Sequence, residues 1–119
     1  MVACIRGANT VLNNNREEML ECTGKMLEAI IADNNLSVDD IVSITFTATK
    51  DLDAVYPAVA AREMGITQAS LMCVQEMYVE GSLPKCIRVS VMTECDLCQK
   101  DVKHVYMGEA VRLRPDLKR

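Results

Sequence analysis

Three charged residues interrupt otherwise apolar segments of the sequence and are the first candidates for chemistry. Arg88 lies in the apolar run 86–92, Glu76 lies in the apolar segment 72–77, and Arg6 closes a third run near the N-terminus. An arginine is almost never buried without a partner, so an anion must meet Arg88 if its strand is buried. Glu76 could be that anion. Two arginines and one glutamate nevertheless leave a net positive charge, and guanidinium groups bind carboxylates bidentately. The pattern predicts either a site for a carboxylate-bearing ligand or an internal ion pair.

Residues for most other kinds of catalysis are missing from the sequence. His104 is the only histidine, and there is no glycine-rich phosphate loop and no GxSxG or HExxH motif, so a hydrolase triad has almost no base to use. A thiol among apolar neighbours, such as Cys73, is usually inert as a nucleophile. Cys95 and Cys98 have the spacing of one zinc knuckle, without the second pair that a tetrahedral site needs. We therefore expect no metal and no cofactor.

Composition limits the class of protein further. The 119 residues fit one domain spanning 1–119. A net charge of −4 argues against a nucleic-acid surface, which needs a basic face. No apolar stretch reaches the roughly 20 residues needed to span a bilayer, and the N-terminus does not resemble a signal peptide. Six cysteines in a chain that is not exported are expected to be reduced thiols, which predicts a cytoplasmic location.

Two helices are predicted to hold these residues in place. The longer extends from a cap at Asn15 to about Asn34, with Glu18 in the position of a capping box and apolar residues recurring at three- and four-residue spacing. Pro57 suits the first turn of a short helix that Gly65 ends. With no tryptophan and one phenylalanine, the core beneath these helices must be mainly aliphatic, with methionine filling the gaps.

The remaining apolar segments predict strands. They are residues 2–6, 40–48, 69–79 and 86–93, with short extended segments at 104–107 and 111–113. In the second of these, Val42, Ile44 and Phe46 alternate with polar residues and should pack on a helix. Residues 80–84 would connect two strands as a hairpin or a loop. Strands and helices do not alternate strictly, so we predict an α+β or mixed α/β fold with helices on one face of a sheet.

Taken in order, these motifs resemble those of one family, the small monofunctional AroH-class chorismate mutases. The resemblance spans nearly all of residues 3–117. It rests on Ile5-Arg6-Gly7-Ala8 with Thr10-Val11, on Ala48-Thr49, Asp51-Leu52 and Ala54-Val55-Tyr56-Pro57-Ala58, on Ala61-Arg62-Glu63 and Gln75-Glu76-Met77, on Lys85-Cys86-Ile87-Arg88-Val89, on His104-Val105-Tyr106, and on Leu113-Arg114-Pro115-Asp116-Leu117.

This resemblance implies an isomerase that converts chorismate to prephenate by a Claisen [3,3] rearrangement, a step of phenylalanine and tyrosine biosynthesis. Such a rearrangement of the chorismate dianion needs a shaped, charged site and no covalent intermediate. The family also implies a homotrimer, with a mixed five-stranded sheet in each subunit, a pseudo-α/β-barrel around the threefold axis, and active sites between neighbouring subunits.

Roles for individual residues follow from the same resemblance. Arg88 would lie near the breaking ether oxygen, Arg6 and Tyr106 would hold a substrate carboxylate, and Glu76 would accept a hydrogen bond from the ring hydroxyl, with Cys73 beside it. The residues lining or covering the cleft would be Tyr56, Ala58, Arg62, Leu113 and Arg114.

Three positions depart from the family pattern, and two other functions stay open. Val59 stands where a lysine is expected at the cleft mouth, Met72 where threonine is common, and Tyr56 in place of phenylalanine. These changes concern entrance charge and substrate affinity. The alternatives are a trimeric imine deaminase of the RidA type, which also has an arginine between subunits, and a non-catalytic carboxylate-binding trimer. Only the mutase needs the full set of Arg6, Glu76 and Tyr106.

Overall fold

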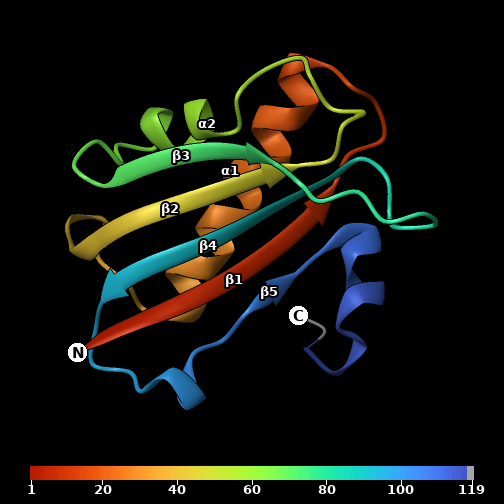
Figure 1. Cartoon of the computed structure of the whole chain (residues 1–119). Coiled ribbons are helices and arrows are strands. Elements are labelled where there is room, and N and C mark those ends of the chain that lie inside the picture. The colour runs from red at the N-terminus through yellow and green to blue at the C-terminus, as the bar shows by residue number, and fades with distance from the viewer. Residues whose placement is uncertain (118–119) are drawn as a thin grey trace.

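The computed structural model, which describes residues 1–117, contains a mixed five-stranded sheet with its helices on one face (Figure 1). The strands are β1 (Val2–Thr10), β2 (Ile41–Ala48), β3 (Ser70–Gln75), β4 (Cys86–Glu94) and β5 (Val105–Tyr106), and the helices are α1 (Arg16–Asp33) and α2 (Ala58–Glu63). The strand order is β3-β2-β4-β1-β5. β4 is antiparallel to β1 and β2, whereas β3 is parallel to β2 and β5 is parallel to β1. The predicted fold class is confirmed.

Helix α1 begins where the sequence predicts, because Asn15 and Glu18 form a reciprocal capping box at its first turn. The Asn15 side chain accepts a hydrogen bond from the Glu18 backbone N–H at 2.8 Å, and the Glu18 carboxylate accepts from the Asn15 side chain at 2.7 Å. Hydrogen bonds from Asn13 and Asn15 lower the pKa of Glu18. The helix ends at Asp33, and Asn35 follows with a left-handed φ of 50°. In residues 1–117 no helix is long and apolar enough to cross a membrane.

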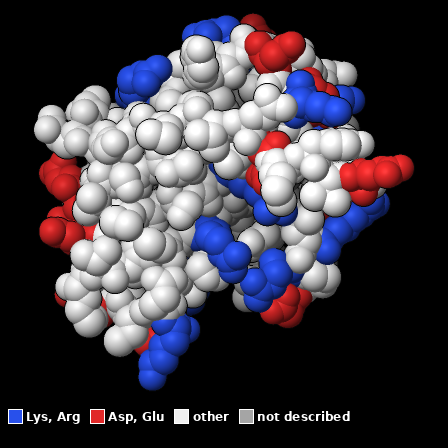
Figure 2. Space-filling view, in the orientation of Figure 1, with Lys and Arg blue, Asp and Glu red and all other residues white. Residues whose placement is uncertain are grey.

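The two faces of the sheet differ in what covers them. Ile5, Ile44, Phe46, Ile87 and Val91 point to the helix side and form one core with Met19, Met26 and Ile30 of α1. Figure 1 shows α1 lying behind the sheet, so Figure 2, in the same orientation, shows the face that no long helix covers. That face is largely uncharged and includes apolar side chains that are 38% to 59% exposed, namely Val2, Met72, Val74 and Met92.

Gly7 lies on β1 at a place where the side chains of α1 approach closely. A Cβ atom added there would come within 2.9 Å of Ile30 Cδ1 and 3.0 Å of Met26 Cγ. We expect Gly7→Ala to lower the free energy of unfolding by about 1–3 kcal/mol, because the crowded side chains can move only by straining the core. Gly24→Ala is the matched control, since no atom lies within 4 Å of its added Cβ. It should stabilise α1 by about 0.5–1 kcal/mol. Urea unfolding measures both, and a Gly7→Ala variant as stable as the parent would contradict the close packing.

The prediction that Val42 packs on a helix is wrong. The pairing of β2 with β4 shifts register between Ile41 and Ser43. Such a bulge adds one residue to a strand and reverses which residues face inward. Ile41 is therefore 5% exposed and belongs to the core, whereas Val42 is 45% exposed.

Two predictions near loops are also wrong. The predicted strand 69–79 ends at Gln75. Of the two alternatives for residues 80–84 the structure has the loop, because β2 lies between β3 and β4 and excludes a hairpin. Residues 111–113 are not extended but belong to a 3-10 helix, Gly108–Leu113. Gly108, with φ 56°, starts this turn, and the fully buried Ala110 anchors it. Further 3-10 turns are Val38–Asp40, Gln99–Asp101 and Pro115–Leu117.

Candidate active site

Arg88 lies on the uncovered face of the sheet, in a row of residues that crosses four strands. Its neighbours by register are Thr47 on β2 and Ala8 on β1, and Ala8 in turn pairs with Tyr106 on β5. The Arg88 side chain is 42% exposed, so the expectation that it sits in a buried strand is wrong. β4 is buried toward the helices, and on the Arg88 face only its first residue, Cys86, is buried. Figure 2 shows lysine and arginine side chains around a hollow on this otherwise largely uncharged face.

Glu76 and Arg88 form a loose ion pair. Glu76 follows the last residue of β3, and its backbone N–H donates to the Ala48 carbonyl at 3.0 Å. Its Oε1 accepts a hydrogen bond from Thr47 Oγ1 at 2.5 Å and lies 3.8 Å from Arg88 Nε. That separation is beyond hydrogen-bond distance. The two charges are close enough to interact, yet Arg88 is not saturated by Glu76.

Arg6 lies beside this pair, in the middle of β1 rather than at a strand end as expected. It pairs with Ser90, two residues along β4 from Arg88, and its side chain is exposed. Its backbone N–H donates to His104 Nδ1 at 2.9 Å. Burial lowers the pKa of His104, and the cations Arg6 and Arg114 lower it further. The neutral form of His104 is therefore favoured beside these two cations, of which Arg114 is paired with Asp116.

The C-terminal segment covers the Tyr106 end of the row of residues that contains Arg88. Tyr106 is 5% exposed and packs in a small cluster with Ala8, Cys86 and Ala110, against which Leu113 also packs. Burial raises the pKa of Cys86, an effect that the neighbouring Arg88 guanidinium partly offsets. The Cys86 thiol is thus kept protonated.

Arg114 follows Leu113, which packs against the same cluster. Its guanidinium binds Asp116 through two hydrogen bonds of 3.1 and 3.0 Å, which lower the pKa of Asp116. The structure therefore brings one group of predicted site residues to the uncovered face, here called the arginine cluster. Its members are Arg6, Glu76, Arg88, Tyr106, Leu113 and Arg114.

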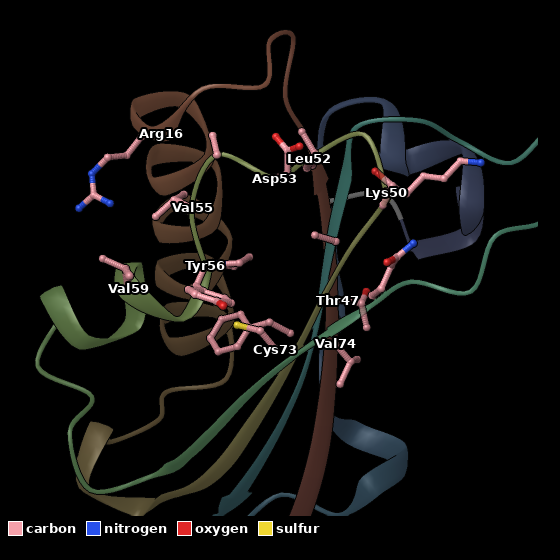
Figure 3. A pocket seen from close by; sticks show the side chains of 16 residues that line it. Arg16, Thr47, Lys50, Leu52, Asp53, Val55, Tyr56, Val59, Cys73 and Val74 are labelled. Carbon is pink, nitrogen blue, oxygen red and sulfur yellow. The ribbon is translucent and has the colours of Figure 1, made fainter.

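The other predicted site residues do not join this cluster. Tyr56 and Cys73 line a cavity of about 650 Å³ between the 49–57 loop and the ends of β2 and β3, together with Val59 (Figure 3). Cys73 pairs with the fully buried Phe46 and so points to the helix side of the sheet, opposite to Arg88. Ala58 is 5% exposed and belongs to the core, and Arg62 is exposed on α2. We call this second group the loop cavity.

Sequence reasoning missed Lys50, which lies between the two groups. It lines the loop cavity and also a smaller cavity of about 90 Å³ that contains Glu76. Its Nζ lies 3.9 Å from the centroid of the Tyr78 ring, a cation–π contact that holds the side chain in place. Figure 3 shows Lys50 and Arg16 extending from opposite sides of the loop cavity. The only sequence signal was a lysine in the loop after the strand 40–48.

Asp51 and Asn14 were also missed, and both fix the loop that forms the cavity. The Asp51 carboxylate accepts from the Lys85 backbone N–H at 3.0 Å and from the Thr49 hydroxyl. The Asn14 side chain accepts from the backbone N–H of Asp53 at 3.1 Å and donates to the Asp53 carboxylate at 2.7 Å. Residues 49–53 are thus tied both to the start of β4 and to the segment before α1.

The described part of the chain offers little for a metal. No group of three or more histidine, cysteine, aspartate or glutamate side chains gathers closely enough to hold an ion there. Cys95 Sγ donates instead to the Leu97 carbonyl at 3.7 Å, and the six cysteines are free thiols.

Comparison with known proteins gives a consistent result over nearly the whole chain. The family model for chorismate mutase type I matches residues 2–117. Chorismate mutase AroH of Bacillus subtilis (strain 168) is 45% identical over 118 residues, which are 98% of this chain and 93% of that protein. Chorismate mutase AroH of Thermus thermophilus is 42% identical over 118 residues, covering 98% and 97%. A solved chorismate mutase from Clostridium thermocellum superposes with a TM-score of 0.88 at 51% identity, covering 90% of this chain and 96% of that one. These matches give no support to an imine deaminase or a carboxylate-sensing module.

Proposed function

The chain belongs to the chorismate mutase type I family, and from this premise we propose how its residues convert chorismate to prephenate. The activity is that of an isomerase of aromatic amino-acid biosynthesis. In a [3,3] rearrangement one carbon–oxygen bond breaks while one carbon–carbon bond forms within the same molecule, and no proton or electron is exchanged with the enzyme. The protein must therefore select the reactive conformer and stabilise the charge that develops on the ether oxygen.

The single observation that carries the mechanism is the incompletely paired Arg88. Its guanidinium is held on a strand, is partly exposed, and lies 3.8 Å from the nearest Glu76 oxygen. Glu76 therefore does not saturate the guanidinium, which can meet an oxygen that becomes negative in the transition state. A preorganised donor of this kind is typically worth about 3–4 kcal/mol. Glu76 accepts from the ring hydroxyl, which fixes the orientation of the ring.

The substrate carboxylates are held by the neighbouring cations. Arg6 binds one carboxylate through its planar fork and Tyr106 donates to the same group. Neutral His104, which accepts a hydrogen bond from the Arg6 backbone, adds no further charge, and Arg114 is paired with Asp116, so the positive field at this point comes mainly from Arg6. Leu113 and Arg114 close the site from the C-terminal side.

We further propose that each complete site combines two copies of the chain in a homotrimer. Cys73 in the loop cavity points to the helix side of the sheet, opposite to Arg88, although Thr47 in the wall of the same cavity shares the Arg88 face. One copy therefore cannot place both Cys73 and Arg88 around one substrate. The exposed apolar residues of the uncovered face, such as Val2, Met72 and Val74, would be buried among three copies. In this arrangement Tyr56, Ala58, Arg62 and Cys73 come from one subunit and the arginine cluster from the next.

Two measurements on the purified chain test these proposals. Loss of chorismate, followed by absorbance, should occur without added metal or cofactor, and a well-folded chain that leaves chorismate unchanged would overturn the function. Sedimentation should give a trimer, and a monomer that still turns over chorismate would overturn the shared site. We also expect a single domain over residues 1–119 and a cytoplasmic location.

Lys50 is expected to supply the charge that Val59 lacks at the entrance of the loop cavity. Lys50→Gln should lower kcat/KM by about 3- to 10-fold at low ionic strength, because an exposed cation near a cleft raises the encounter rate of a dianion. The deficit should shrink in salt, while kcat changes little. Lys100→Gln, in the turn Gln99–Asp101, is the matched control and should behave as the parent. Equal salt dependence for Lys50→Gln and the parent would contradict this role.

A further inference from the structure

We propose that Thr47 is a positioning residue of this reaction: its hydroxyl holds Glu76 away from Arg88, so that the Arg88 guanidinium stays available to the substrate. The inference rests on the proposed function and deepens it. It concerns a residue that lies on the wall of the loop cavity and also contacts the arginine cluster.

The geometry around Thr47 is specific. On β2 it stands opposite Arg88 of β4 on one side and opposite Val74 of β3 on the other. Its Oγ1 donates to Glu76 Oε1 at 2.5 Å, and this is the same carboxylate oxygen that lies 3.8 Å from Arg88 Nε. The oxygen nearest to the cation is therefore already engaged by a hydroxyl.

Several features fix this hydroxyl in place. Threonine is β-branched, so its χ1 angle has few options, and β2 is hydrogen-bonded on both sides. The backbone of Glu76 is tethered to the Ala48 carbonyl at 3.0 Å. Only the side chain of Glu76 can move toward Arg88, and the bond to Thr47 opposes that movement.

Without the hydroxyl, Glu76 has a strong alternative partner. The two side chains are partly shielded, at 42% exposed for Arg88 and 27% for Glu76, and a carboxylate readily forms two parallel hydrogen bonds with a guanidinium. A closed pair would neutralise Arg88 and occupy the N–H groups that the ether oxygen needs. Arg6 and Tyr106, which hold a carboxylate, would be left as they are. Loss of the hydroxyl should therefore lower kcat more than it raises KM.

The experiment uses the full chain with Thr47→Val, Thr47→Ser and the matched control Thr45→Val. Thr45 lies on the same strand and face but pairs with Ser90 instead of Arg88. We expect Thr47→Val to lower kcat by about 10- to 100-fold with KM changed by less than about 3-fold, as for a misplaced catalytic group. Thr47→Ser restores the hydroxyl and should turn over within about 3-fold of the parent, as should Thr45→Val.

The outcomes separate the two proposals. Absence of turnover in the parent would refute the proposed function, whereas an active parent with an equally fast Thr47→Val variant would refute only the role of Thr47. A Thr47→Ser variant as slow as Thr47→Val would also refute it. Should Thr47→Val fail to fold, Thr47→Ala removes the same hydroxyl without added bulk and takes its place. A crystal structure of the slow variant should show Glu76 within hydrogen-bond distance of Arg88, and an unchanged separation would overturn the proposal.

Discussion

Replacing Arg88 by alanine should lower kcat by about 10² to 10³, with a much smaller change in KM. The reason is that the charge Arg88 is proposed to meet grows only as the ether bond breaks, so its interaction is stronger in the transition state than with bound chorismate. Its partial exposure and the loose pair with Glu76 leave the guanidinium available for this. The quantity to measure is kcat per folded active site.

Arg88→Lys distinguishes a catalytic from a structural role of this residue. Lysine keeps the charge but loses the planar fork, so the variant should recover only part of the rate. A structural Arg88 would instead reveal itself as a lowered melting temperature, with the remaining folded protein turning over normally. Near-parental kcat in folded Arg88→Ala would rule out the mechanism.

Mixing two inactive variants should regenerate activity if each site is shared between copies. Arg88→Ala disables the arginine cluster, and Val59→Asp places an anion in the wall of the loop cavity, where it would repel the dianion. Refolded together in equal amounts, the two chains should regain about a quarter of the parental activity, because about a quarter of randomly assembled interfaces pair an intact cluster with an intact cavity.

A second mixture tests whether activity returns merely because two variants are refolded together. Arg88→Ala and Arg6→Ala both disable the arginine cluster, which comes from one copy, so their mixture has no intact combination and should stay inactive. Recovery of activity in this mixture, or no recovery of activity in the first mixture, would contradict a site divided between the loop cavity and the arginine cluster.

Local signals predicted the elements well where one segment determines its own structure. The Asn15–Glu18 cap placed the start of α1 correctly, because a cap depends only on residues within one turn. Val42 was misplaced because a bulge depends on how β2 pairs with β4, far away in the chain. The choice between a hairpin and a loop at 80–84 could not be made from the sequence for the same reason, since strand order is a property of the whole sheet.

The proposed site was predicted by an argument that was partly wrong about structure. Arg88 attracted attention as a charge in a buried strand, yet it faces the open side of the sheet. The functional anion partner of Arg88 stays a prediction, and its basis is that an arginine in an apolar strand is unusual on either face. Thr47 could not be recognised in the same way. A threonine in an alternating strand is ordinary, and only the register that places it between Glu76 and Arg88 gives it a proposed role.

The strand order also has a consequence for how the chain folds as it leaves the ribosome. In the part of the chain that the structure describes, β1 pairs only with β4 and β5, which are made long after it. During synthesis β1 therefore remains without a strand partner until β4 has been made, while α1, β2 and β3 can already associate. Sheets completed by pairings between strands far apart in the sequence form slowly, and a strand edge that is still unpaired can pair with another chain. The pairing of β1 with β5 places Tyr106 beside Ala8, two residues from Arg6, so the carboxylate-binding half of the site would be assembled only after β5 has been made.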